Sequence, residues 1–255
     1  MTRVLSGAVL AALAVAVVWL APAALFLAVA GLLLGLAVVE YARLAEAVGC
    51  PVFVLPGGAA AFLTAFAVAR PAAATAWFDA AVVAIGMALA GTAMRGWRGG
   101  PDALGRVAAT VLPSVYLGVP VGALVAVREA RGPAALFLVM LTVMVSDTAQ
   151  YYTGRLFGRR PLAPAISPKK TVEGALGGFV CGALVMIGAG APWLPDVSAP
   201  ARGVLGVAVV ALGIAGDLFE SMLKRSAGVK DSSALIPGHG GVLDRIDALL
   251  FVAPV

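Results

Sequence analysis

The chain has 255 residues, of which 62% are hydrophobic and only 12% are charged, and its mean hydropathy is +1.02. Soluble domains carry about 25% charged residues, so this composition excludes an ordinary water-soluble globular protein. The formal net charge is +5. Basic loops at a membrane surface account for that excess, so no nucleic-acid partner is expected.

Uncharged apolar runs recur along the chain. About 18 such residues are enough for a helix to cross the roughly 30 Å hydrocarbon layer of a lipid bilayer. The sequence therefore predicts an all-α, polytopic transmembrane protein. Eight runs lie near residues 4–20, 22–39, 52–69, 74–94, 107–127, 133–152, 172–190 and 203–222. A ninth run begins after Asp247 and is too short to cross before the chain stops.

The first run also resembles a signal peptide, because Arg3 precedes it and Ala21-Pro22-Ala23 follows it. Further spans follow at once, which favours a first transmembrane helix. A signal peptide would enter the membrane with the same polarity, so both interpretations give one topology.

The positions of Lys and Arg predict the orientation, because short basic loops stay in the cytoplasm. With the N-terminus inside, 14 of the 18 basic residues fall in inner segments. Only Arg70, Arg128, Arg131 and Arg202 fall outside. The prediction is a multi-pass protein of the inner (cytoplasmic) membrane.

Residues 1–145 read as generic transmembrane helices, and residues 146–255 as a C-terminal transmembrane region that carries the chemistry. Gly31 with Gly35, and Gly178 with Gly182, have the spacing that lets helices approach closely. Cys50 and Cys181 have no Cys-x-x-Cys spacing, so neither a zinc site nor a disulfide framework is expected.

Polar residues appear first around Asp147, at the inner end of the sixth run. A carboxylate there is costly and is expected to be functional or paired. The segment from Ser167 to Gly174 then places Lys169 and Lys170 before a helix start. Capping by Thr171 or Ser167 explains part of this segment. Two lysines beside a helix N-terminus also suit anionic oxygens.

The densest charge cluster runs from Gly216 to Asp247. Asp217, Ser221 and Lys224 are spaced i, i+4, i+7, so they share one helix face, which we expect to line a polar cavity. The alternative is an ion pair between Glu220 and Lys224 at the water interface. That pair leaves Asp217, in the apolar part of the run, unexplained.

Asp244 and Asp247 lie three residues apart at an expected helix start. Two carboxylates on one face, brought against Asp217, would form an oxygen-rich site for a hard divalent cation. The turn at 238–241 offers backbone N–H groups that no side chain obstructs, which suits phosphate. Together these residues predict a metal and phosphates.

The segment 221–247 resembles the complete signature of the phosphatidate cytidylyltransferase (CDP-diacylglycerol synthase) family. It reads Ser221-Met222-Leu223-Lys224-Arg225, then Lys230-Asp231, then Pro237-Gly238-His239-Gly240-Gly241-Val242-Leu243-Asp244-Arg245-Ile246-Asp247. Other blocks that resemble the family are Ser146-Asp147-Thr148, 154–158, 167–174 and 216–221. The resemblance covers residues 146–250.

This resemblance implies an enzyme of phospholipid biosynthesis, a nucleotidyltransferase that condenses CTP with phosphatidic acid to give CDP-diacylglycerol and pyrophosphate. It implies eight to nine spans, a polar cavity that faces the cytoplasm, and a homodimer. It also implies one or two Mg²⁺ ions, or a monovalent cation beside one, held by Asp217 and Asp244 with support from Asp247. Family members usually complete a last span after the signature, so the last helix is expected to be missing or re-entrant.

The candidate residues fall into two sets. The predicted catalytic residues are Asp217, Ser221, Lys224, Asp244 and Asp247. The predicted substrate-binding residues are Lys169, Lys170, Arg225, Lys230, His239, Arg245 and Asp147. A lipid phosphate is already ionised near neutral pH, so no general base is expected. Two alternatives stay open: another lipid acceptor, such as an isoprenoid ether lipid, and an ion-coupled transporter that uses Asp147 and Asp217.

Overall fold

The computed structural model describes residues 2–74, 77–97, 99–236, 238 and 240–254. Pro237 and His239 of the sequence predictions lie outside these residues, as does Arg98, one of the 14 basic residues predicted in inner segments. The helices are α1 Thr2–Leu20, α2 Ala23–Ala47, α3 Val54–Ala69, α4 Pro71–Ala74, α5 Phe78–Gly96, α6 Ala103–Pro113, η1 Ser114–Gly118, α7 Val119–Arg131, α8 Pro133–Phe157, α9 Val172–Gly188, α10 Gly190–Trp193, α11 Ala199–Ser226 and α12 Leu243–Val252. The strands are β1 Pro161–Ala163 and β2 Ser167–Thr171.

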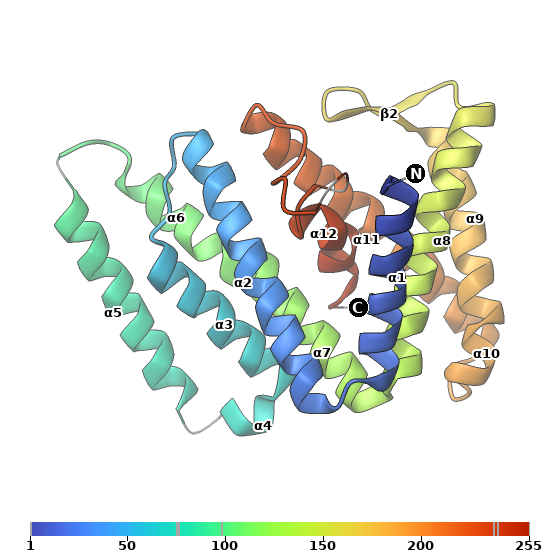
Figure 1. The fold of residues 1–255 in the computed structure, drawn as a ribbon, viewed down its shortest axis with the longest axis horizontal. Coiled ribbons are helices and arrows are strands. Elements are labelled where there is room, and N and C mark those ends of the chain that lie inside the picture. Colours follow the sequence, from blue (N-terminus) through green and yellow to red (C-terminus); the bar gives the residue numbers. More distant parts are fainter. Residues whose placement is uncertain (1, 75–76, 98, 237, 239, 255) are drawn as a thin grey trace.

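The long helices run between two ends of the molecule (Figure 1). Among the described residues, five helical stretches are long and apolar enough to cross a membrane, namely Ala23–Ala47, Phe78–Gly96, Ala103–Arg131, Pro133–Phe157 and Ala199–Ser226. Shorter apolar helices cover Gly7–Leu20, Val54–Ala69 and Val172–Gly188. All of them overlap runs that the sequence predicts as spans. The molecule is thus a multi-pass membrane protein, while the number of spans stays a prediction.

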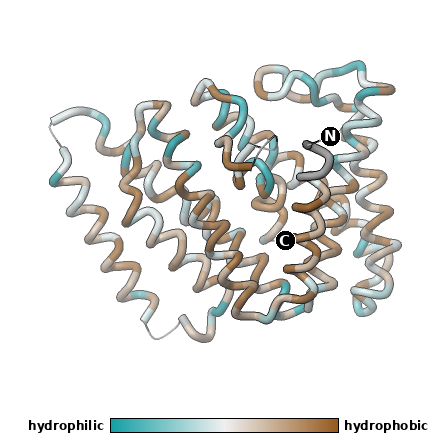
Figure 2. Tube along the Cα trace, in the orientation of Figure 1, coloured by the Kyte–Doolittle hydropathy of each residue, from teal (hydrophilic) through white to brown (hydrophobic). Residues whose placement is uncertain are grey.

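Hydrophilic residues gather at one end of the bundle, which is the upper end in Figure 2. The hairpin β1–β2 and the segment between α11 and α12 both lie there (Figure 1). The bias of Lys and Arg predicts that both segments lie on the inner side of the membrane, and in the structure they lie at the same end of the bundle (Figure 1).

The two-stranded antiparallel sheet corrects the all-α prediction in detail. Pro161 pairs with Thr171 and Ala163 with Ser167. The sequence analysis treats this stretch as a polar loop because it has no alternation of apolar and polar residues long enough to indicate a strand. The predicted boundary at residue 145 falls within α8, which continues to Phe157.

The stretch α6–η1–α7 is one helical stretch, Ala103–Arg131, that contains the wider π turn η1. Pro113 has no N–H to bond the carbonyl of Ala109 four residues earlier, and the Tyr41 hydroxyl donates to that carbonyl instead, at 3.0 Å. The wider turn of η1 follows directly. Tyr41 lies on α2, so this hydrogen bond holds α2 against α6 at Ala109.

Helices α8, α9, α11 and α12 pack in succession. A Cβ at Gly178 of α9 would lie 2.6 Å from Cγ of Gln150 on α8, so glycine is required there for the close approach. This confirms packing as the role of that glycine. Helix α12 also joins the N-terminal half, since Leu243 and Leu250 share a buried cluster with Leu34 of α2 and Leu117 of η1.

Candidate active site

A polar cavity of about 420 Å³ lies where the end of α8, the hairpin, the start of α9 and the middle of α11 meet. Its lining is Asp147, Gln150, Tyr151, Gly154, Arg155, Lys169, Lys170, Thr171, Gly174, Ala175 and Asp217. The structure therefore brings together four of the predicted residues from three separate stretches of chain. Lys170 forms an ion pair with Asp217 across the cavity.

The hairpin is anchored at its base by Glu173. This carboxylate, in the first turn of α9, accepts the backbone N–H groups of Arg159 at 2.9 Å and Arg160 at 3.1 Å. The Thr171 hydroxyl accepts the N–H of Gly174 at 3.1 Å, which confirms the predicted cap. These contacts hold Lys169 and Lys170 beside the N-terminus of α9. A helix N-terminus favours anionic oxygens because its first backbone N–H groups are unpaired.

Asp217 and Ser221 share one face of α11, as their spacing predicts. The Ser221 hydroxyl donates to Asp217 Oδ1 at 3.3 Å. Asp217 is about one-third exposed, so its carboxylate reaches the cavity while remaining held from two sides, by Ser221 and Lys170.

Lys224 turns away from the cavity into the protein. Its ammonium pairs with Glu220 and also donates to Asp244 Oδ1 at 2.6 Å. The Glu220 side chain is fully buried. The ion pair expected between Glu220 and Lys224 thus forms, but in the interior and not at the water interface. Lys224 connects α11 to α12.

Asp244 accepts hydrogen bonds on both oxygens. Besides Lys224 on Oδ1, Oδ2 accepts from the Ser232 N–H at 2.9 Å, the Ser232 hydroxyl at 2.8 Å and the Gly241 N–H at 2.7 Å. Burial favours the neutral acid, but these donors outweigh it and lower the pKa of Asp244 from 3.8 to about 2. Asp244 is therefore a charged anchor of the segment between α11 and α12.

Asp247 lies one turn further along α12, a helix of 10 residues that is too short to span. Burial and then the carboxylate of Asp217 raise the pKa of Asp247 from 3.8 to about 7. The backbone at Asp247 lies against Gly216, the residue before Asp217, because a Cβ at Gly216 would lie 2.5 Å from the Asp247 carbonyl oxygen. Asp244, which the sequence grouped with Asp217 and Asp247, belongs to a different hydrogen-bond network.

The donor chemistry of Asp217 and Asp247 fits a hard cation, because carboxylates offer oxygen ligands. Lys170 neutralises Asp217 in this structure, so a bound cation would take the place of that lysine. In the described part of the chain, no three His, Cys, Asp or Glu side chains form a ready metal-binding group. The predicted three-carboxylate site of Asp217, Asp244 and Asp247 stays a prediction.

The remaining basic candidates lie outside the cavity lining. Arg225, Lys230 and Arg245 are exposed, and Arg225 donates to the carbonyl of Val229 at 3.0 Å, which closes the end of α11. Their predicted contacts with phosphate stay predictions.

Glu40 is a residue that the sequence analysis missed. It lies on α2, is 3% exposed, and accepts hydrogen bonds from the segment 232–243. The rule that singles out Asp147 applies equally to Glu40, a lone carboxylate beside a long apolar run. Residues 1–145 therefore contribute directly to the surroundings of the site.

Gly216 sets the distance between α11 and α12. A Cβ at this position would lie 2.5 Å from the carbonyl oxygen of Asp247, whereas a Cβ at Gly213, one turn earlier, would meet only Ala248 and Val252, each at 3.8 Å. Gly216→Ala is expected to destabilise the protein by about 1–3 kcal/mol through overpacking.

The thermal midpoint of the protein in detergent tests this prediction. Gly213→Ala is the matched control for Gly216→Ala. We expect a lower midpoint for Gly216→Ala alone. Equal midpoints for both variants would contradict the close contact between the two helices.

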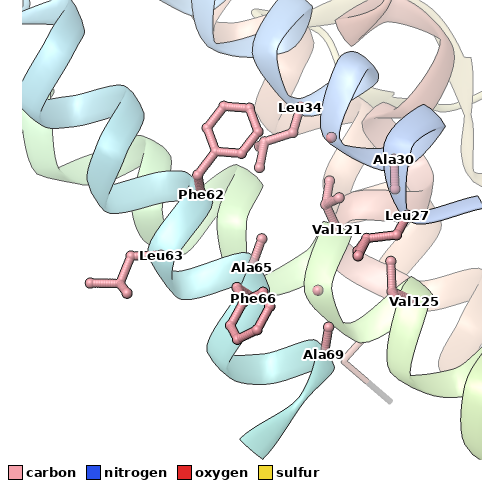
Figure 3. Close-up of a pocket in the computed structure, with 12 residues that line it drawn as sticks. Leu27, Ala30, Leu34, Phe62, Leu63, Ala65, Phe66, Ala69, Val121 and Val125 are labelled. Atoms are coloured by element: carbon pink, nitrogen blue, oxygen red, sulfur yellow. The ribbon is translucent and has the colours of Figure 1, made fainter. Parts of the chain in front are cut away.

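A second cavity, of about 410 Å³, lies between α2, α3 and α7 (Figure 3). Leu27, Phe62, Phe66 and Val125 are among the side chains that line it, and all twelve lining residues are apolar. Such a surface has no group that binds phosphate or a cation, so the candidate active site is the polar cavity.

Comparison with known proteins gives a family and several relatives. The model of the "Cytidylyltransferase family" matches residues 1–255. A protein named phosphatidate cytidylyltransferase from Haemophilus influenzae is 47% identical over 129 residues, which are 49% of this chain and 44% of that protein.

Two further proteins of the same name are similar. The one from Mycobacterium bovis is 38% identical over 165 residues, which are 60% of this chain and 51% of that protein. The one from Aquifex aeolicus is 45% identical over 120 residues, which are 47% of this chain and 44% of that protein. The chain spans about half the length of the curated relatives it matches.

Proposed function

Since this chain belongs to the cytidylyltransferase family, we propose that it transfers the cytidylyl group of CTP to phosphatidic acid, giving CDP-diacylglycerol and pyrophosphate. The names of its relatives support phosphatidic acid as the acceptor. The observation that carries the proposal is the ion pair of Lys170 with Asp217 in a polar cavity. Basic and acidic groups on one concave surface suit a substrate phosphate together with a cation.

In the proposed reaction, an oxygen of the lipid phosphate attacks the α-phosphorus of CTP, and the bond to the β-phosphate breaks so that pyrophosphate leaves. The residues bind and align anions, and none needs to remove a proton. Lys170 exchanges Asp217 for a phosphate oxygen, and Lys169 binds beside it. Ser221 orients Asp217 through its hydrogen bond.

Asp217 and Asp247 are the residues proposed to hold a divalent cation such as Mg²⁺. When bound, the cation supplies positive charge to the triphosphate and to the leaving pyrophosphate. The Asp244 side chain is 4% exposed and bound within the protein, whereas that of Asp217 is about one-third exposed at the cavity. We assign it the support of α12 and of the preceding segment.

The proposed topology has eight spans in the inner membrane, with the hydrophilic end of Figure 2 in the cytoplasm. It follows from the eight apolar helical stretches and from the bias of Lys and Arg. A maleimide that cannot cross the membrane should label Arg159→Cys and Lys230→Cys from the cytoplasmic side only. Labelling of either one from outside contradicts the topology. A homodimer is also proposed, and the mass of the purified protein in detergent tests it.

Release of pyrophosphate by the purified protein tests the function. We expect release only when CTP, phosphatidic acid and a divalent cation are all present. Release with an isoprenoid ether lipid phosphate and not with phosphatidic acid would assign the other acceptor. No release with any lipid phosphate, in a protein that is folded and monodisperse, would exclude a cytidylyltransferase and leave the transporter.

A further inference from the structure

We propose that Glu40, on α2, is a positioning residue for cytidylyl transfer. It caps the N-terminus of α12 from a distant part of the chain and holds Ser232 and Ser233 beside that N-terminus. The proposal rests on the proposed function in one respect, because the orientation of α12 matters for the reaction only if Asp247 acts there.

Three donors and one shared hydroxyl surround the Glu40 carboxylate. Oε1 accepts from the Ser233 hydroxyl at 2.7 Å and the Val242 N–H at 3.0 Å. Oε2 accepts from the Leu243 N–H at 2.8 Å and lies 2.9 Å from the Ser232 hydroxyl, whose single proton it shares with Asp244. A carboxylate that is 3% exposed is costly to bury, and these contacts offset that cost.

The backbone donors belong to the beginning of α12. Helix α12 begins at Leu243, and the residue before it, Val242, has no side-chain cap. The first N–H groups of a helix have no partner within the helix, and its N-terminus favours a negative charge. Glu40 supplies both an acceptor and the charge, and so replaces the missing local cap.

The same contacts extend to the signature residues. The Ser232 hydroxyl lies within hydrogen-bond distance of Glu40 and also of Asp244 Oδ2, and Asp244 binds Lys224. A chain of polar contacts therefore connects α2 to α12 and α11. The tight packing of Glu40 and Ser232 against Gly241 leaves no room for a Cβ at that residue.

Orientation of α12 determines where Asp247 lies relative to Asp217. Helix α12 carries Asp247 one turn after the capped residues, and it contacts α11 closely at Gly216. Loss of the Glu40 cap frees the beginning of α12 while the contact at Gly216 remains. The expected consequence is a shift of Asp247, and not a loss of the whole fold.

Glu40→Gln is the sharpest test, because the amide has nearly the same size but keeps only one acceptor oxygen. Its NH₂ group would face the N–H of either Val242 or Leu243. We expect turnover per folded enzyme to fall by about ten- to a hundredfold, and the Mg²⁺ concentration for half-maximal rate to rise. Glu46→Gln, on the same helix but exposed, is the matched control and should behave like the parent protein.

A spin label reports the cap independently of activity. Leu235 is 54% exposed and lies in the segment that Glu40 holds. In a background without Cys50 and Cys181, a label on Leu235→Cys should become more mobile with Glu40→Gln and stay unchanged with Glu46→Gln. A purely structural role elsewhere in the fold would lower the thermal midpoint without a change in Mg²⁺ dependence.

Turnover and label mobility together distinguish failure of the cap proposal from failure of the proposed function. Parent-like turnover, Mg²⁺ dependence and label mobility in Glu40→Gln would overturn the proposal, and so would a change in the thermal midpoint alone. If the parent protein releases no pyrophosphate, the proposed function fails by itself. Label mobility then decides the cap: greater mobility in Glu40→Gln supports it, and unchanged mobility overturns it.

Discussion

Asp217→Asn is expected to reduce pyrophosphate release by about a thousandfold while the protein stays folded. The change removes one negative charge and one carboxylate oxygen at the polar cavity, where Asp217 faces Lys170 and Asp247. About one-third of the Asp217 side chain is exposed, so the amide fits without a buried unpaired group. The thermal midpoint in detergent should change little.

The matched control for this variant is Asp231→Asn, whose carboxylate is exposed at the same end of the molecule. It should keep parent-like turnover. High Mg²⁺ should restore part of the activity of Asp217→Asn, since an amide oxygen binds hard cations less well than a carboxylate does. Parent-like activity and unchanged cation dependence in Asp217→Asn would remove Asp217 from the cation site.

Asp244→Asn is expected to differ, because it should lose stability as well as activity. The Asp244 side chain is 4% exposed and its partner Lys224 is 11% exposed. Removal of one partner of a buried ion pair costs about 3–5 kcal/mol. Lys224 keeps its ion pair with Glu220 in this variant, so its charge is not left unpaired. We therefore expect a loss of stability near the lower value, about 3 kcal/mol.

The thermal midpoint and the monodisperse fraction of Asp244→Asn in detergent check this prediction, with Asp217→Asn and Asp231→Asn measured beside it. We expect a clear loss for Asp244→Asn only. A variant that is as stable as the parent protein and is inactive would show instead that Asp244 acts at the cation, as the sequence alone predicts.

The comparison of Asp217 with Asp244 shows what the sequence could predict. Helical spacing correctly places Asp217 and Ser221 on one face, because the period of a helix is a local property. The spacing of Asp244 and Asp247 likewise predicts α12. Spacing does not determine which neighbour a side chain meets across two helices. The sequence therefore predicts Lys224 and Asp244 as catalytic residues but not their contact with each other, which the structure shows.

Local sequence patterns could not predict two other features, the hairpin β1–β2 and the contacts of Glu40. The hairpin β1–β2 has strands of three and five residues, too short for a reliable alternation of apolar and polar side chains. Glu40 meets its partners across 192 to 203 residues of sequence. A single sequence carries no signal for such a pairing beyond the unusual place of one carboxylate beside an apolar run.

The contact of Glu40 with Leu243 also has a consequence for biosynthesis. The two residues are 203 positions apart, and chains grow at about 5–20 residues per second. Roughly ten to forty seconds therefore pass between synthesis of the cap and synthesis of the helix that it caps. During that interval α2 enters the membrane with its carboxylate still without these donors. Assembly of the candidate active site is thus expected to follow insertion of the earlier helices, and an interruption of translation before residue 242 would leave inserted protein without the Glu40 cap.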